Sequence, residues 1–179
     1  MHDLIQYFIS TPTALYLAVG LVSLCIGSFL NVVIFRTPKM MEQEWHTECQ
    51  MLLHPEQAII DHEKLTLSKP ASTCPKCQTK IRWYQNIPVI SWLVLRGKCG
   101  TCQNPISFRY PFIELLTMLC SLTVVAVFGP TLQMVAGLIL TWVLIALTFI
   151  DFDTQLLPDR FTLTLAALGL AMNSFGLFT

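Results

Sequence analysis

The stretch that decides the fold is Leu115–Ile150, LLTMLCSLTVVAVFGPTLQMVAGLILTWVLIALTFI, which contains no charged residue. A helix needs about 20 residues to cross a bilayer, so these 36 residues are too many for one crossing and enough for two. Gly129-Pro130 lies between the two halves, and such a dipeptide is typical of a turn. The stretch therefore predicts two transmembrane helices, over residues 111–128 and 131–150.

Two further apolar runs flank this pair. No charge occurs between Asp3 and Arg36, and residues 14–35 are long enough, at 1.5 Å per residue, to cross about 30 Å of hydrocarbon. A secretory signal peptide is the alternative, but it needs a basic start and a shorter apolar core. Residues 161–179 form the last apolar run. We therefore expect an α-helical integral membrane protein with about four transmembrane helices.

The polar residues are concentrated in one segment. The chain is 54% hydrophobic and 12% charged, against roughly 25% charged in soluble domains. Its formal net charge of zero argues against nucleic acid as a partner. Ten of the eleven lysines and arginines lie between Arg36 and Arg109. Residues 36–110 are therefore predicted to form a polar insert between the first and second spans.

The basic residues beside the spans also predict the orientation. Lysine and arginine close to a span favour the cytoplasmic side. The insert is therefore expected in the cytoplasm, with residues 1–13 and the Gly129-Pro130 turn in the periplasm. Residues 151–160 then form an acidic loop on the same side of the membrane as the insert.

Four of the seven cysteines form two pairs within the insert, Cys74-Pro-Lys-Cys77 and Cys99-Gly-Thr-Cys102. Two such turns supply the four sulfur ligands that zinc prefers, and iron in a similar site is the alternative. A cytosolic location disfavours disulfides. Four protein sulfurs leave no position for water, which indicates a structural metal. The apolar residues from Trp83 to Leu93 are expected to pack on this site or lie on the membrane surface, and a small core is favoured over a substrate platform.

The segment Ile150-Asp-Phe-Asp-Thr-Gln-Leu-Leu-Pro-Asp159 is the second informative feature. Its simplest interpretation is an interfacial loop with solvated carboxylates. Asp159 is suited to cap the helix that follows, and Asp153 has no evident constraint. Asp151 directly follows the third span, where a carboxylate with a second one as partner could activate water. Glu114, near the start of the second span, is expected to be an interfacial residue.

Several blocks of sequence resemble the type IV prepilin peptidases, bacterial inner-membrane aspartic proteases that also N-methylate the new N-terminus. Besides the cysteine pairs and the acidic segment, the matching blocks are Gly27-Ser-Phe-Leu-Asn-Val-Val33, Pro38-Lys-Met-Met41, Asn86-Ile-Pro88 and Arg109-Tyr-Pro-Phe-Ile-Glu-Leu115. The resemblance implies that Asp151 is the first catalytic aspartate and that Cys74, Cys77, Cys99 and Cys102 bind the metal. It also implies prepilins or type II secretion pseudopilins as substrates and S-adenosylmethionine as methyl donor.

The sequence departs from this family in one respect. The family's second catalytic aspartate lies in a Gly-x-Gly-Asp-x-Lys motif, which these 179 residues do not contain. We therefore expect either a fragment of a longer protein or a truncated product. The alternatives are an inactive membrane-anchored zinc module that binds prepilins or assembly proteins, and a protein that keeps only the methyltransferase role. No glycine-rich nucleotide motif assigns the site of the methyl donor.

Overall fold

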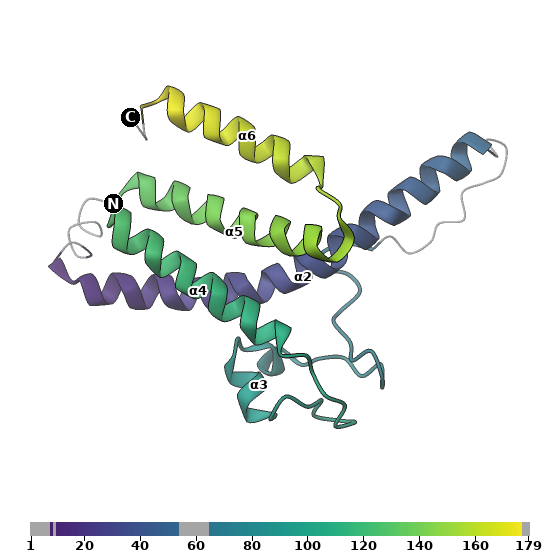
Figure 1. The fold of residues 1–179 in the computed structure, drawn as a ribbon. Helices are drawn as coiled ribbons and strands as arrows, with labels where there is room; N and C mark the ends of the chain where they lie inside the picture. Colours follow the sequence, from purple (N-terminus) through teal and green to yellow (C-terminus); the bar gives the residue numbers. More distant parts are fainter. Residues whose placement is uncertain (1–7, 9, 54–64, 177–179) are drawn as a thin grey trace.

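The computed structural model describes residue 8, residues 10–53 and residues 65–176, and this part of the chain is mostly helical. Figure 1 shows the long helices α2, α4, α5 and α6, with the short helix α3 beside the start of α4. The elements in chain order are α2 (Pro12–Leu53), the 3-10 helix η1 (Trp83–Asn86), α3 (Ile90–Val94), α4 (Arg109–Phe128), α5 (Leu132–Thr154) and α6 (Asp159–Ser174).

Three of these helices, α2, α4 and α5, are long and apolar enough to cross a membrane. Together with the cysteine cluster between the first two of them, they confirm the predicted class of α-helical membrane protein. Helix α6 has 16 residues and is about 24 Å long, which is shorter than the roughly 30 Å hydrocarbon core. The fourth span therefore stays a prediction.

Helix α2 is much longer than its predicted span. It has 42 residues, about 63 Å, and continues past Arg36 and Pro38 to Leu53, through residues that the sequence assigned to the insert. Its last part extends beyond the bundle (Figure 1). Residues 39–53 are rich in Met, Glu, Gln and Leu, which are strong helix formers, so the helix continues beyond the end of the apolar run.

Helix α5 also ends later than its apolar run. It includes Asp151 and Asp153, and the backbone leaves the helix at Gln155, whose φ is 53° and whose N–H donates to the Asp151 carbonyl at 2.8 Å. The predicted loop 151–160 is thus reduced to residues 155–158. The predicted cap role of Asp159 is wrong, because Pro158 is the capping residue and Asp159 is the first residue of α6. A carboxylate there still faces the positive end of the helix dipole.

Helices α2 and α4 pack closely. A Cβ placed on Gly27 would lie 2.7 Å from Cα of Glu114 and 3.2 Å from Cβ of Thr117, so only glycine allows this approach. Asn31 donates one hydrogen bond to the Tyr110 carbonyl across the interface, at 3.2 Å. The buried apolar cluster beside this contact joins α2, α4 and α5 and consists of Leu30, Val33, Ile34, Ile113, Ile145, Ala146 and Ile150.

Candidate metal centre and acidic membrane face

The two cysteine pairs lie in turns of the same local structure. In the first, the N–H of Cys74 donates to the Thr79 carbonyl at 3.0 Å, and Gln78, with φ 56°, donates its N–H to the Cys74 carbonyl. In the second, Cys99 donates to the Asn104 carbonyl at 2.8 Å.

The second turn repeats the left-handed residue as well. Gln103 has φ 56° and donates its N–H to the Cys99 carbonyl at 3.0 Å. Both turns therefore follow the pattern Cys-x-x-Cys-Gln, and both aim their two sulfurs inward. The repeated glutamine is a feature of the sequence that indicates the shared turn structure, and a prediction from the cysteine spacing alone leaves it out.

The four sulfur atoms converge on one point. All four lie within 4.8 Å of one another, and Sγ of Cys74 is 3.8 Å from Sγ of Cys102. A tetrahedral zinc ion with bonds of about 2.3 Å requires sulfur separations of about 3.8 Å. The cluster therefore has the ligand set and the spacing for a metal ion such as zinc.

The electrostatics of the cluster also suit a cation. A hydrogen bond with the Thr79 hydroxyl, 3.3 Å from the sulfur, lowers the pKa of Cys77 to about 6. The backbone N–H of Asn104 lowers the pKa of Cys102, but burial and the three neighbouring thiols raise this pKa by more, so that its net value is about 11. A divalent ion among the sulfurs would favour the thiolate form of all four.

Two buried, charged side chains of the membrane helices bind the insert by hydrogen bonds. Arg36 of α2 is buried, and its guanidinium donates to the carbonyls of Thr66 and Pro70 at 2.8 and 2.7 Å. Glu114 of α4 is 7% exposed and accepts the N–H of Val89 at 2.7 Å. Close packing against Gly27 encloses Glu114 in protein, and the prediction that it is an interfacial rather than a functional residue stays a prediction.

The segment between the cysteine pairs does not form the small core that was favoured. Within it Ser91 is buried, and Trp92 donates its indole N–H to the Ile106 carbonyl at 3.2 Å. Most of its large apolar side chains are exposed, including Ile87, Ile90 and Leu93. The expectation of a small core is therefore wrong, and the alternative, a substrate platform, stays a prediction.

The three aspartates of the acidic segment have different surroundings. Asp153 forms an ion pair with Arg109, with two hydrogen bonds of 2.9 and 2.5 Å that join the end of α5 to the start of α4. Asp159 is exposed at the start of α6. Asp151 is exposed, and its carboxylate makes no hydrogen bond to any residue that the structure describes. Of the two aspartates at the end of α5, Asp153 is thus occupied by an ion pair with α4, while the Asp151 carboxylate has no hydrogen-bond partner among the described residues.

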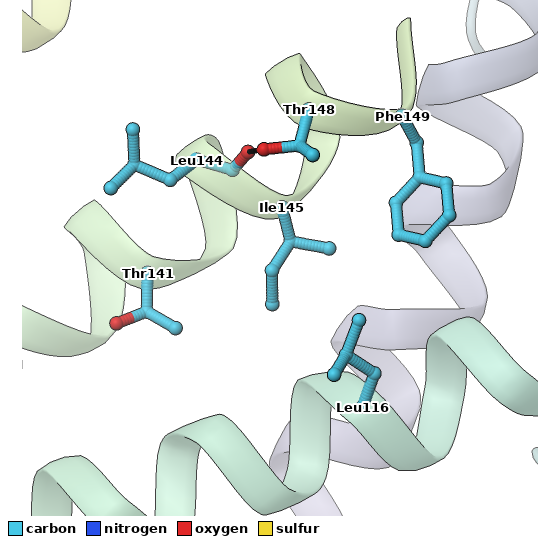
Figure 2. Close-up of a pocket in the computed structure, with 6 residues that line it drawn as sticks. All are labelled: Leu116, Thr141, Leu144, Ile145, Thr148 and Phe149. Carbon is cyan, nitrogen blue, oxygen red and sulfur yellow. Dashed lines mark hydrogen bonds between the residues drawn. The ribbon is translucent and has the colours of Figure 1, made fainter. Parts of the chain in front are cut away.

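An apolar cavity of about 260 Å³ lies between α4 and α5 (Figure 2). Figure 2 shows Leu116 of α4 facing Ile145 of α5, with Phe149 at one end. Phe149 precedes Asp151 by two residues, so the cavity reaches the end of the bundle that carries the acidic segment. Its six lining residues are Leu116, Thr141, Leu144, Ile145, Thr148 and Phe149.

Comparison with known proteins places this arrangement in a family. The model of the bacterial peptidase A24 N-terminal domain matches residues 21–128, which include most of the first span, the four cysteines and α4. The chain belongs to the peptidase A24 family. A second model, of the type IV leader peptidase family, matches residues 138–179, which contain the whole acidic segment. The predicted resemblance is thereby confirmed.

Curated members of the family are similar over most of this chain. A prepilin leader peptidase/N-methyltransferase of Aeromonas hydrophila is 49% identical over 93% of the chain and 58% of its own length. The proteins with the same name from Legionella pneumophila and Pseudomonas aeruginosa are 46% and 47% identical, over 95% and 98% of the chain. The chain spans about three-fifths of the length of these relatives. No solved structure matches it.

Proposed function

We propose that this chain supplies one catalytic carboxylate, Asp151, and the metal-binding insert of an aspartic-type peptidase that removes leader peptides from type IV prepilins or type II secretion pseudopilins. The observation that carries the proposal is the exposed, unpaired carboxylate of Asp151 at the end of a membrane helix, within the segment that matches the leader peptidase family. The reaction would take place at the cytoplasmic face of the bacterial inner membrane, on the side that the positive-inside rule assigns to the insert.

The chemistry needs two carboxyl groups. In its ionised form Asp151 would take a proton from a water molecule, whose oxygen attacks the scissile carbonyl carbon. A second, protonated carboxyl would donate to the carbonyl oxygen, and collapse of the tetrahedral intermediate would break the C–N bond as the departing amine takes up a proton. The family's Gly-x-Gly-Asp-x-Lys motif would supply that second group. Asp153 is a poor substitute because Arg109 already binds it.

The four cysteines would hold a structural zinc ion. The ion would supply folding free energy to an insert that has little buried core, and Asp151 would carry out its part of the reaction without it. By this proposal Cys74, Cys77, Cys99 and Cys102 are ligands only.

The names of the relatives also support a methyl transfer after cleavage. The new N-terminal amine would attack the methyl carbon of S-adenosylmethionine, forming a C–N bond, releasing S-adenosylhomocysteine and losing one proton. No described residue is assigned to this donor.

The test is cleavage of a prepilin by a full-length protein, made by joining residues 1–179 to the remaining part of the Aeromonas hydrophila relative. Asp151→Asn keeps the shape of the side chain and should abolish cleavage, measured as the mass of the pilin N-terminus. Asp153→Asn is the matched control, and it should retain cleavage because an exposed ion pair contributes only about 0–1 kcal/mol. Normal processing by Asp151→Asn would overturn the proposal.

A further inference from the structure

An exposed apolar surface lies next to the metal centre. Ile90, Leu93 and Val94 follow the i, i+3, i+4 spacing of one helical side of α3, and Ile87 is exposed in the turn before it, where Val89 with φ 58° interrupts the helical repeat. The exposed fractions are 40% for Ile87, 59% for Ile90, 61% for Leu93 and 74% for Val94. We call these four side chains the α3 face.

The opposite side of α3 is fixed within the insert. The Ser91 hydroxyl donates to the Tyr84 carbonyl at 2.8 Å and accepts the N–H of Ile87 at 3.1 Å. The indole of Trp92 packs over Gly97, where a Cβ would lie 2.9 Å from the ring. The orientation of α3 is therefore set by contacts on its polar side, and the α3 face points outward.

The position of α3 along the membrane helices is fixed as well. Val89, directly before α3, donates its N–H to Glu114, five residues or about 7.5 Å into α4. Figure 1 shows α3 beside the first turns of α4 rather than beyond its end. The polar interface of a bilayer adds roughly 5–7 Å to each side of the hydrocarbon. With the start of α4 in that interface, the α3 face would lie at the depth of the headgroups and the adjoining ends of the lipid chains.

The chain segment that contains this surface carries charge of a single sign, although Glu114 of α4 accepts the Val89 N–H and Asp153 of α5 pairs with Arg109. Residues 65–109 contain no aspartate or glutamate. They contain seven basic residues, namely Lys69, Lys76, Lys80, Arg82, Arg96, Lys98 and Arg109. Even with four thiolates and a divalent metal ion, which together carry two negative charges, the segment keeps a net positive charge. Such a segment attracts anionic lipid headgroups.

We propose that the insert docks on the bilayer, with the α3 face buried among lipid chains at the interface and the basic side chains on anionic headgroups. A short helix with one apolar side and basic surroundings binds membranes in this way. The exposed apolar side chains and their attachment beside the start of α4 favour a lipid surface over an acidic protein partner. The metal centre thereby lies at a fixed height against the membrane, whatever substrate the protein processes.

The test places a diazirine photo-crosslinking amino acid at Val94 in the chain reconstituted into nanodiscs with phosphatidylglycerol. Leu119, 58% exposed within α4, is the control for lipid contact, and exposed Thr101 in the second cysteine turn is the control for an insert position off the face. Mass spectrometry should find lipid adducts at Val94 at least fivefold more often than at Thr101. Replacing phosphatidylglycerol by phosphatidylcholine should reduce the adducts at Val94 and leave those at Leu119 unchanged.

A second variant tests the apolar contact itself. Leu93→Glu should lower the number of lipid adducts at Val94, whereas Thr101→Glu, which adds the same charge, should not. Unchanged zinc content shows that the insert remains folded in both variants. Lipid adducts at Leu119 with none at Val94 would overturn the proposal. Crosslinks from Val94 to a protein in native membranes, whether a second copy or another chain, would overturn it in favour of a protein interface.

Discussion

Gly27→Ala should separate the first two membrane helices. The added Cβ would lie 2.7 Å from Cα of Glu114, a backbone atom that cannot rotate away. Ordinary contact begins at 3.4 Å, so α2 and α4 must move apart locally by about 0.7 Å, the difference between the two distances. The same movement would stretch the hydrogen bond from Asn31 to the Tyr110 carbonyl from 3.2 Å to beyond hydrogen-bonding distance.

Three terms set the expected magnitude. Overpacking a close interface costs about 1–3 kcal/mol, and a lost hydrogen bond about 1 kcal/mol more. Gly27→Ala also gains up to about 1 kcal/mol because alanine is the better helix former. The net loss in unfolding free energy should therefore be about 1–3 kcal/mol.

The assay is unfolding of the purified chain in mild detergent by added SDS, followed by circular dichroism at 222 nm. Gly169→Ala in α6 is the matched control, since nothing lies within 4 Å of its new methyl group. It should be neutral or stabilising by up to about 1 kcal/mol. If Gly27→Ala were as stable as Gly169→Ala, the close packing of α2 against α4 would be refuted.

Two other predictions concern the insert. Removing the metal by chelation, or Cys99→Ser, should make residues 65–108 sensitive to protease, while the helical circular dichroism signal of the spans remains. An insert that resists protease equally well with and without metal would contradict the structural role of the metal. Glu114→Ala should remove the acceptor for the Val89 N–H, so that hydrogen exchange at the Val89 amide becomes at least tenfold faster. Glu114→Gln keeps an oxygen acceptor and should leave this exchange rate nearly unchanged. Equal exchange rates in the two variants would argue against the hydrogen bond.

The sequence predicted the membrane class and the metal cluster because both depend on local patterns. An uncharged run of 36 residues is typical of transmembrane helices, and two Cys-x-x-Cys turns are typical of a small number of functions, chiefly metal binding. Both turns place a glutamine with φ 56° after the second cysteine, so the repeated glutamine in the sequence also indicated that the two turns have the same backbone conformation.

The helix ends were predicted less well, because hydropathy marks the membrane boundary and not the end of the helix. Helix α2 continues beyond Arg36 on helix-forming residues, and α5 continues through Asp153. The ion pair of Asp153 joins residues 44 positions apart, and the bond from Val89 to Glu114 joins residues 25 apart. Neither contact has a local signature, so only the tertiary packing of α4 reveals them.

Helix α4 connects the metal centre to the acidic end of α5. Trp92 of the insert meets Phe108 edge-on with ring centres 5.8 Å apart, Phe108 lies 6.3 Å from Phe112, and Phe112 meets Phe149 edge-on at 6.5 Å. Phe149 precedes Asp151 by two residues, and the Arg109 guanidinium lies 5.4 Å from the centre of its ring. These rings and the Arg109–Asp153 ion pair therefore join the insert to the end of α5 that carries Asp151, while the four sulfurs leave the metal no position for a reactant.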